Sequence, residues 1–293
     1  MPLSHLLLAL SVVFIWGTNF VVIKWGLAEL PAFLFATLRF ALSALPWIFI
    51  FRRPAVPWHA MARVGLLLGV GQFGLLYWAM RQDISPGLAS LVVQSQVFFT
   101  ILMSMAFNGE RARPLQVAAL LLATAGYVVV GWHSATDPGA AVTLMGLGLV
   151  LAAGFSWACT NMIMRGAGRV NMVAFTAWSS LYAIIPLFLI SLAVDGPNLV
   201  AHALAHASGW AWLAALWQAV GNTVFAFGAW GWLLARHPAV TVTPMALLVP
   251  VFGILASVLL LDEPLPAWKI IAAGLVLAGL SLNVYAGRAG GRR

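Results

Sequence analysis

Uncharged polar and aromatic side chains recur at helical spacing inside long apolar stretches of this sequence. Trp16 and Asn19 are three residues apart, and Trp157 and Asn161 are four apart, so each pair would share one face of a helix. Amides can bind an ammonium or a carboxylate without a fixed charge, and an indole ring offers its face to a cation. These pairs therefore predict a binding site for a small zwitterion. The alternative is that the asparagines hydrogen-bond across helices as structural contacts, worth about 0.6–2 kcal/mol each.

Other apolar stretches carry groups of the same kind. Gln218 and Asn222 are four apart and share a face, whereas Gln94 and Gln96 are two apart and cannot. Gln94 instead aligns with Ser90, one helical turn earlier. The predicted substrate-binding residues, taken together, are Trp16, Asn19, Gln72, Tyr77, Gln94, Gln96, Trp157, Asn161, Trp217, Gln218, Asn222 and Thr243.

A second group of residues could act at the mouth of such a site. Arg39 stands about seven residues, or roughly 10 Å, into an apolar stretch, where a charge costs a few kcal/mol unless it snorkels or finds a partner. We expect it to reach the headgroups or a helix C-terminus; attraction of carboxylates is the alternative. Lys24 and Glu29 could form a gating pair. Pro244 and Pro250 remove helix hydrogen bonds, for gating or for a packing kink.

The acidic residues of the chain all fall at the ends of apolar stretches or between them. A carrier coupled to protons usually keeps an ionisable relay within the membrane, so we favour a facilitator, or weak coupling through groups at the mouths, over a buried carboxylate relay. No clustered metal ligands, catalytic triad or phosphate-binding loop are present, and Cys159 is the only cysteine. The sequence therefore predicts no catalytic residues, no metal, no cofactor and no enzymatic activity.

These residues must be positioned by membrane-spanning helices. Hydrophobic residues make up 63% of the 293-residue chain and charged residues 8%. Because backbone polar groups in hydrocarbon must be satisfied within the segment, a span needs about 20 apolar residues in a helix. We predict an all-α membrane protein with ten such helices, at 3–23, 32–51, 62–80, 86–107, 114–132, 142–164, 171–193, 209–234, 238–261 and 266–286.

The positions of the basic residues predict the orientation of these helices. With the N-terminus in the cytoplasm, eleven Lys and Arg residues fall inside and three, Lys24, Arg81 and Lys269, fall outside. Both termini are then cytoplasmic. The net charge of +8 is thereby explained by topology and by contact with anionic headgroups, so we expect the lipid bilayer and no nucleic acid as a partner.

The chain also repeats itself. At an offset of 153 residues, 99–104 aligns with 252–257 and Glu110 with Glu263; at an offset of 141, Phe14-Ile15-Trp16 aligns with Phe155-Ser156-Trp157. Each copy holds five spans, and an odd number places the second copy upside down, with Glu110 inside and Glu263 outside. We predict repeats at 1–135 and 140–288, followed by a basic tail at 289–293. Inverted repeats are typical of secondary transporters.

Several motifs resemble one family of such transporters. They are Trp16-Gly17-Thr18-Asn19, Leu38-Arg39-Phe40, Pro86-Gly87-Leu88, Gln94-Ser95-Gln96, Gly109-Glu110-Arg111 and Leu247-Leu248-Val249-Pro250. By these motifs the sequence resembles the EamA branch of the drug/metabolite transporter superfamily, and it is most similar to the bacterial exporters of cysteine and O-acetylserine and of aromatic amino acids in that branch. The family often has proline where this chain has Gln96.

The resemblance implies a bacterial inner-membrane protein that exports small metabolites from the cytoplasm. We expect neutral amino acids as cargo, carried by alternating access of the two halves. The alternatives are a carrier of another cargo, such as a cationic drug, a purine or a sugar; a membrane-embedded enzyme acting on lipids; or a receptor that does not transport. We expect no required protein partner.

Overall fold

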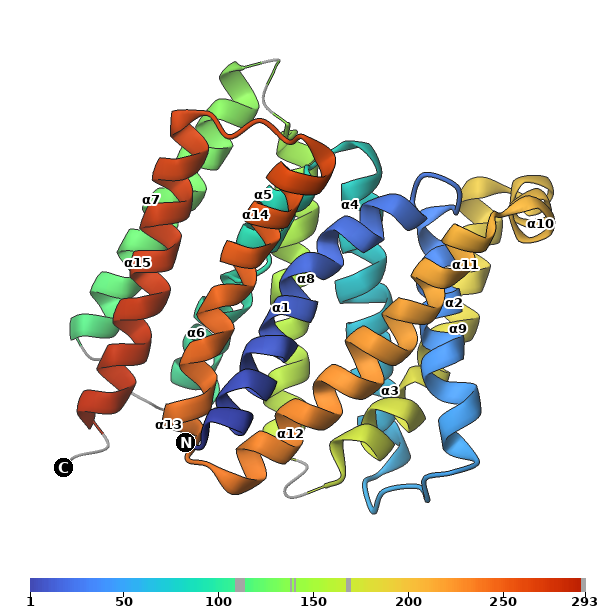
Figure 1. Cartoon of the computed structure of the whole chain (residues 1–293), viewed down its shortest axis with the longest axis horizontal. Coiled ribbons are helices and arrows are strands. Elements are labelled where there is room, and N and C mark those ends of the chain that lie inside the picture. The colour runs from blue at the N-terminus through green and yellow to red at the C-terminus, as the bar shows by residue number, and fades with distance from the viewer. Residues whose placement is uncertain (109–113, 138, 140, 167–169, 291–293) are drawn as a thin grey trace.

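The computed structural model of the chain describes residues 1–108, 114–137, 139, 141–166 and 170–290, and within them it is a bundle of helices (Figure 1). In these ranges the only extended pairing is an isolated bridge between Ile84 and Val142. Helices satisfy their backbone polar groups internally, which suits so apolar a chain.

The regular elements follow one another with short connections, and prolines precede or begin several of them, where the missing N–H costs little. In order they are α1 (Leu3–Gly26), α2 (Ala32–Ile48), α3 (Trp58–Leu66), the π-helix η1 (Leu67–Gly74), α4 (Leu75–Gln82), α5 (Pro86–Val92), α6 (Ser95–Asn108), α7 (Pro114–Thr136), α8 (Leu144–Gly166), α9 (Met172–Asp195), α10 (Pro197–His206), α11 (Gly209–Leu216), the π-helix η2 (Trp217–Phe225), α12 (Ala226–Arg236), α13 (Ala239–Val242), the 3₁₀-helix η3 (Thr243–Leu247), α14 (Leu248–Leu261) and α15 (Ala267–Gly290).

Among the described residues, eight helices are long and apolar enough to cross a membrane. A ninth is obtained if Pro197–His206 and Gly209–Arg236, which meet at a bend of 97°, count as one span. Ala32–Ile48 is apolar but has only 17 residues, fewer than the about 20 of a full crossing. The chain is thus a multi-pass helical membrane protein, and the number ten stays a prediction. Helix α10 lies where a plain connection was expected.

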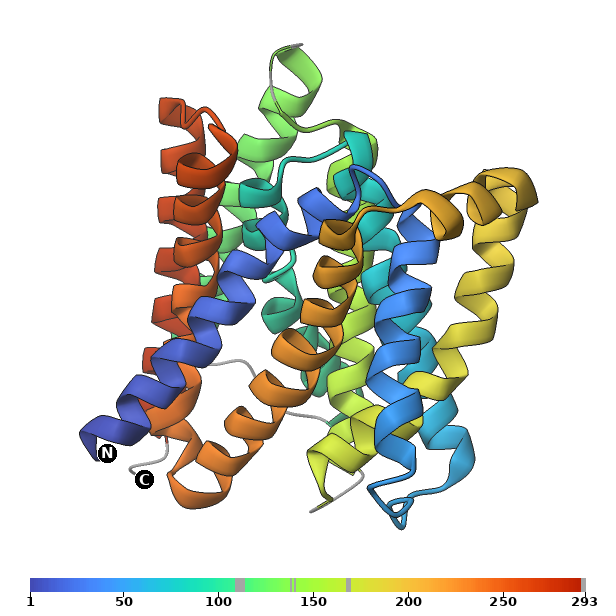
Figure 2. The same cartoon turned by 45° about the vertical axis from the view of Figure 1, so that its right-hand side comes forward.

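The start of α1 and the end of α15 lie at the same end of the bundle, the lower end in Figures 1 and 2. We call this the terminal end. The connections at 27–31, 83–85 and 262–266 lie at the opposite end, which we call the far end (Figure 1). Glu110, whose side relative to Glu263 would test the opposite orientation of the halves, is outside the described residues.

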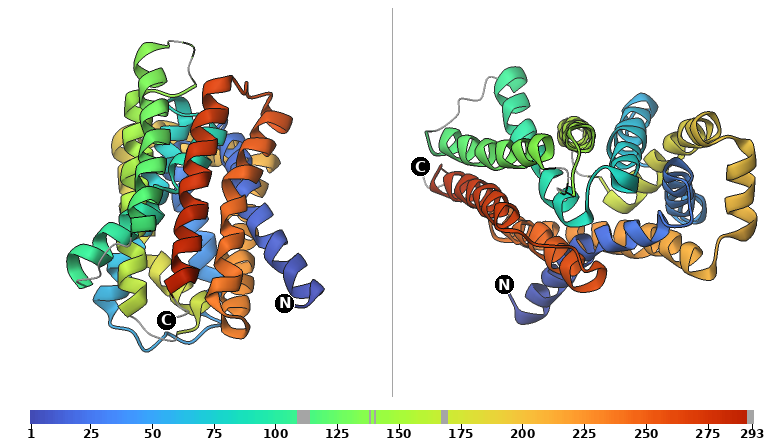
Figure 3. Two further views of the ribbon diagram at one scale, coloured as in Figure 1. Left: turned by 90° about the vertical axis from the view of Figure 1, so that its left-hand side faces the viewer. Right: turned by 90° about the horizontal axis from the view of Figure 1, so that it is seen from above.

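Four helix pairs dominate the packing: α7 with α15, α2 with α9, α1 with α14, and α6 with α8. Helices α7 and α15 lie side by side at one edge of the bundle (Figure 3). Their contact depends on glycine, because a Cβ on Gly126 would lie 2.9 Å from Ala272 O and one on Gly279 would lie 2.6 Å from Ala119 O. Small residues permit such close approach of helices in membranes.

Several of the apolar stretches contain a segment without regular α geometry. The π-helices η1 and η2 interrupt α3–α4 and α11–α12, the chain turns at Val93–Gln94 between α5 and α6, and η3 precedes α14. Wide turns of the π type often occur at functional sites, because they redirect side chains and leave carbonyl groups unpaired. The turn at Val93–Gln94 forms without proline, and we did not expect it from the sequence.

Candidate functional site

A cavity of about 530 Å³ lies within the bundle. This volume is within the range of small-molecule sites, which run from roughly 300 to 1,000 Å³. Met172, Thr243 and Asn283 contribute to its lining from the parts of α9, η3 and α15 nearest the terminal end, whereas no described residue of the far-end connections lines it. The cavity therefore extends from the middle of the bundle toward the terminal end.

Nine of the predicted substrate-binding residues line this cavity. Their side chains come from both halves of the chain and are all uncharged. They are Trp16, Asn19, Gln72, Gln94, Gln96, Trp157, Asn161, Asn222 and Thr243. Of the described residues that line the cavity, none is ionisable.

Aromatic and polar residues that we did not select from the sequence complete the lining. Phe20, Phe73 and Phe227 add apolar area, and Asn283 adds another amide near the end of α15. Asn283 could have been noticed as a polar residue inside an apolar stretch. The phenylalanines could not, because the sequence offers no signal that separates a phenylalanine at a cavity from one facing lipid.

Three predicted residues do not line the cavity. Trp217 is 38% exposed on the surface of the bundle, and its ring covers Gly221 of the same π-helix. Tyr77 and Gln218 are completely buried and lie behind the lining. The placement of these three side chains in the cavity is therefore wrong in this structure. The π geometry of η2 explains part of the error, because it turns neighbouring residues by a different angle from an α-helix.

Tyr77 and Gln218 instead enclose Arg39. This arginine is only 1% exposed, and its guanidinium donates to Tyr77 Oη at 3.1 Å, Gln218 Oε1 at 2.8 Å and Thr223 Oγ1 at 3.2 Å. It also lies 3.6 Å from the centre of the Phe73 ring, within cation–π range. Arg39 therefore does not reach the headgroups as expected. Its cost of burial is offset by neutral acceptors and an aromatic face.

The hydrogen bonds of this cluster continue to the cavity wall. Gln218 Nε2 donates to Asn19 Oδ1 at 2.7 Å, and Tyr77 Oη donates to Gln218 Oε1 at 3.0 Å. On the opposite wall Asn161 Nδ2 donates to Gln96 Oε1 at 2.9 Å. Both asparagines thus form contacts between helices and line the cavity as well, so the structural and the binding interpretations are compatible.

Two amide oxygens at the cavity lack a partner. Gln72 Oε1 and Asn222 Oδ1 are buried and accept no hydrogen bond from any residue that the structure describes. Trp16 Nε1 donates to the backbone oxygen of Asn222 at 3.4 Å, not to its side chain. Since an unpaired buried acceptor costs free energy, a donor from a bound molecule would stabilise these groups.

Lys24 and Glu29 do not pair with each other. Lys24 Nζ donates to Met80 O and Arg81 O at 3.0 and 3.1 Å, which are carbonyls in the last turn of α4. Glu29 accepts from the backbone N–H and the hydroxyl of Ser208, the N-cap of α11. The expected ion pair between Lys24 and Glu29 is therefore absent from this structure, and a gating role of the two residues stays a prediction. Cations prefer helix C-termini and carboxylates prefer helix N-termini, and these hydrogen bonds from Ser208 also lower the pKa of Glu29.

The two prolines differ in their surroundings. Pro244 begins the 3₁₀-helix η3, and Pro250 is the third residue of α14, where its missing N–H has no helical partner to lose. Neither lines the cavity, although Thr243 and Val249 next to them do. Their role in gating stays a prediction.

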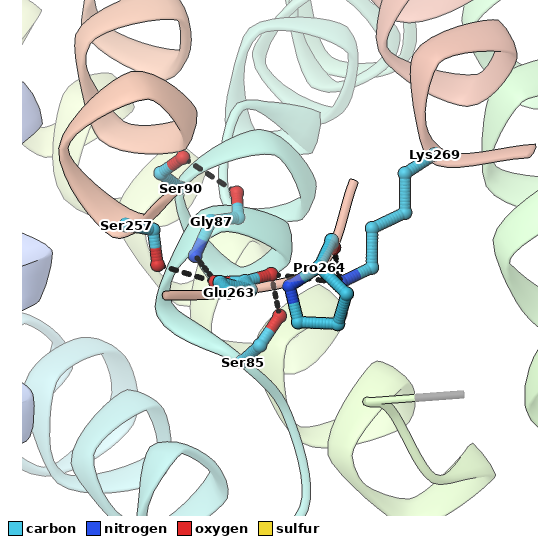
Figure 4. Close-up of polar contacts among 7 residues, drawn as sticks. All are labelled: Ser85, Gly87, Ser90, Ser257, Glu263, Pro264 and Lys269. Carbon is cyan, nitrogen blue, oxygen red and sulfur yellow. Dashed lines mark hydrogen bonds and ion pairs between the residues drawn. The ribbon is translucent and has the colours of Figure 1, made fainter. Parts of the chain in front are cut away.

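At the far end, five residues form a hydrogen-bonded cluster, shown in Figure 4 and here called the far-end cluster: Ser85, Gly87, Ser257, Glu263 and Lys269. The Glu263 carboxylate accepts hydrogen bonds from the Ser85 and Ser257 hydroxyls, from Gly87 N–H at 3.0 Å, and from Lys269 Nζ at 2.9 Å. The side chain of Glu263 is 9% exposed and that of Lys269 4%.

Burial alone raises the pKa of Glu263, but hydrogen bonds from Ser257 and Ser85 and the ion pair with Lys269 outweigh it and hold the pKa below its ordinary value. The carboxylate therefore stays ionised at neutral pH. Ser85 and Gly87 belong to the first half of the chain and Glu263 to the second, so this carboxylate ties the two halves together at the far end (Figure 4).

Residues 3–132 and 144–285 each match the EamA-like transporter family. A probable amino-acid metabolite efflux pump of Escherichia coli (strain K12) is 41% identical over 95% of this chain and 94% of its own length. A protein of the same name from Salmonella typhimurium is 39% identical over the same shares. An uncharacterized inner membrane transporter of E. coli, YedA, is 28% identical over 96% of this chain and 90% of its own.

One solved structure supports the fold. A crystal structure of a protein 19% identical to this chain superimposes over 99% of both chains with a TM-score of 0.64. At that identity the likeness concerns the fold alone.

Proposed function

Because the chain belongs to the EamA-like transporter family, we propose that it is a multi-pass protein of the bacterial inner membrane that exports neutral amino acids or close derivatives. The family match points to a transporter rather than an enzyme. The observation that carries the choice of cargo is the cavity of about 530 Å³, whose described lining holds amides and indoles but no ionisable group.

The chemistry of this lining suits an amino acid. The ammonium group needs acceptors, and the buried oxygens of Gln72 and Asn222 are acceptors without a partner in the described chain. Trp16 and Trp157 offer aromatic faces to a cation and apolar area to a side chain. A cargo with net positive charge would lack a counter-ion in such a cavity, which disfavours strongly cationic drugs. The relatives named as amino-acid metabolite efflux pumps support the same choice.

We propose alternating access as the mechanism, with halves 1–135 and 140–288 arranged as inverted repeats. The separate family matches of residues 3–132 and 144–285 support two related halves. The helix packing also supports two related halves. If α1 corresponds to α8 and α6 corresponds to α14, the packed pairs α1 with α14 and α6 with α8 are equivalent. The cavity extends toward the terminal end, and the far-end cluster joins the two halves at the other end, as a far end closed to the cargo would require. By the distribution of basic residues, the terminal end is the cytoplasmic one.

We also propose that transport is not driven by a proton relay within the cavity. The carboxylate of the far-end cluster lies outside the lining and is held ionised by its partners. A neutral site of amides leaves the direction of transport to the gradient of the cargo.

The test is transport by the purified protein in liposomes. Each neutral amino acid of a labelled panel is loaded in turn, and its efflux is compared with that from protein-free liposomes, with and without a pH gradient. We expect efflux of at least one neutral amino acid at a rate independent of the gradient. No efflux of any amino acid would refute the cargo, and strong dependence on the gradient would refute the facilitator mechanism.

A further inference from the structure

Arg39 is a buried cation whose hydrogen-bond partners are all neutral. In the described chain the guanidinium donates to a phenol, an amide and a hydroxyl, and none of its hydrogen bonds or ion pairs involves a carboxylate. A positive charge in so apolar a place acts over a longer range than in water, because little solvent screens it. Phe73, which the guanidinium faces, is itself part of the cavity lining. The cavity therefore lies within the field of an uncompensated cation.

The same arginine determines which way two side-chain amides point. The O and N atoms of an amide can usually be exchanged without a visible change in shape, but a guanidinium can only donate. Because Arg39 donates to Gln218, the atom that faces it must be Oε1, and Tyr77 donates to the same oxygen. Gln218 must then direct its N–H groups toward Asn19, and the atom of Asn19 that receives them must be Oδ1.

This direction of the hydrogen bonds leaves the side-chain N–H groups of Asn19 available to a molecule in the cavity. Its Oδ1 accepts the hydrogen bond from Gln218, and its Nδ2 donates to none of the residues that the structure describes. Since Asn19 lines the cavity, the polar group that it presents there is an N–H donor with a cation behind it. Such a group favours an anionic oxygen.

We propose that the chain of hydrogen bonds from Arg39 through Gln218 makes Asn19 the binding position for the carboxylate of the cargo. The inference rests on the proposed function and deepens it. Asn19 contacts the cargo, whereas Arg39 and Gln218 are positioning residues. The substrate class is thereby narrowed to compounds that carry a carboxylate, and amines of the same shape without one are poor ligands.

On the opposite wall, no such chain of hydrogen bonds fixes which atom of an amide faces the cavity. Asn161 donates to Gln96, but exchanging O and N in both amides would leave that hydrogen bond intact, so the pair does not determine which atom faces the cavity. The two walls therefore differ chemically although the halves resemble each other. An amino acid bound between them has a preferred direction, with its carboxylate on the Asn19 side.

Competition binding to the full-length protein in nanodiscs tests this assignment. The labelled ligands are phenylalanine and leucine. The competitors are the corresponding amines, phenethylamine and 3-methylbutylamine, and the corresponding acids, 3-phenylpropionate and 4-methylpentanoate. For the wild type we expect each amino acid to compete at least about tenfold better than its amine, as the loss of one hydrogen bond to a charged group implies.

Two variants separate the carboxylate position from packing. Asn19→Asp replaces the N–H donors by an anion of the same shape, and we expect the preference for the amino acid over the amine to fall by at least about tenfold. Gln218→Glu still accepts from Arg39 and Tyr77 but cannot donate to Asn19, and it compensates the charge of Arg39. It should reduce the same preference although Asn19 is unchanged, which a purely structural role of Gln218 would not do.

Asn161→Asp is the matched control, because it adds the same charge on the opposite wall. Its effect on the preference for a carboxylate should be smaller than that of Asn19→Asp. If Asn19→Asp does not fold, Gln218→Glu decides. The inference is overturned if the folded variants bind the labelled amino acids with the preference of the wild type. A wild type that binds no amino acid would overturn the proposed function, and the inference with it.

Discussion

Ser85 offers a direct way to weaken the closure of the far end. Its hydroxyl donates to Glu263, and this bond and that of Gly87 N–H are the contacts of the far-end cluster that join the first half of the chain to the second. The hydroxyl of Ser257 donates to the same carboxylate from within the second half. Ser85→Ala therefore removes a hydrogen bond between the halves, which must break when the far end opens. Ser257→Ala removes a similar hydrogen bond within the second half, which can persist when the far end opens.

The size of the effect follows from the type of bond. A hydrogen bond to a charged group contributes about 1.5–3 kcal/mol, and we take the lower value because the Glu263 side chain keeps some exposure. About 1.5 kcal/mol corresponds to roughly a tenfold change in the ratio of open to closed far ends. Lys269 keeps its carboxylate partner in Ser85→Ala, so the variant does not leave a buried charge unpaired.

The assay is labelling of a cysteine in the cavity from the far side. Cys159 is the only native cysteine, so Cys159→Ala gives a background into which Ile23→Cys is introduced; Ile23 lines the cavity and is fully buried. A membrane-impermeant maleimide is applied to vesicles of each orientation. From the far side, Ser85→Ala should raise the labelling rate about tenfold, and Ser257→Ala by about twofold at most. Equal rates for the wild type and Ser85→Ala would refute the proposal that the far-end cluster holds the far end closed.

Three further outcomes are expected. The folded-state pKa of Glu263 lies below its ordinary value of 4.5, so the stability that the ionised carboxylate contributes is present above pH 4.5 and is lost as pH falls through the lower folded pKa. The transport rate in proteoliposomes should therefore be constant from about pH 5.5 to 8. A change of the transport rate with pH inside that range would contradict the assignment of Glu263 as an ionised carboxylate. Asn19→Ala and Gln94→Leu should each lower amino-acid efflux at least about tenfold at near-normal expression, and full rates in both would show that the cavity is not the site. Gly126→Ala should lower thermal stability by about 1–3 kcal/mol, since its Cβ would lie 2.7 Å from Val276 Cγ2, whereas Gly274→Ala on α15, with nothing within 4 Å, should not; equal melting temperatures would mean that α7 and α15 can separate.

The cavity lining shows how far the residue types of a membrane protein predict a site. Amides and indoles inside apolar stretches are costly unless they find partners or a binding site, so Asn19, Gln94 and Asn161 could be selected from composition and spacing. Spacing failed where the helix was not an α-helix. Gln218 and Asn222 were expected on one face, but within η2 Asn222 lines the cavity and Gln218 points to Arg39.

Arg39 and the far-end cluster show which contacts could not be predicted from the sequence. The partners of Arg39 include Gln218 and Thr223, which are 179 and 184 residues away in the sequence, and Glu263 meets Ser85 across 178 residues. No local pattern connects such residues. We therefore expected Arg39 to seek the headgroups and Lys24 to pair with Glu29, which are the nearest solutions along the chain, and both expectations were wrong.

The amino-acid sequence by itself determined that the chain is a bundle of membrane helices, that its family is one of transporters, and that the available polar groups within the helices are almost all neutral. These properties depend on composition and on short-range periodicity, which the cost of burying backbone and charge in lipid makes easy to recognise. Only the tertiary structure decided which amides share one cavity, which of them a buried guanidinium orients, and which carboxylate joins the two halves at the far end. Those outcomes depend on contacts between distant segments, where a shift of one turn in the packing would give each polar group a different partner.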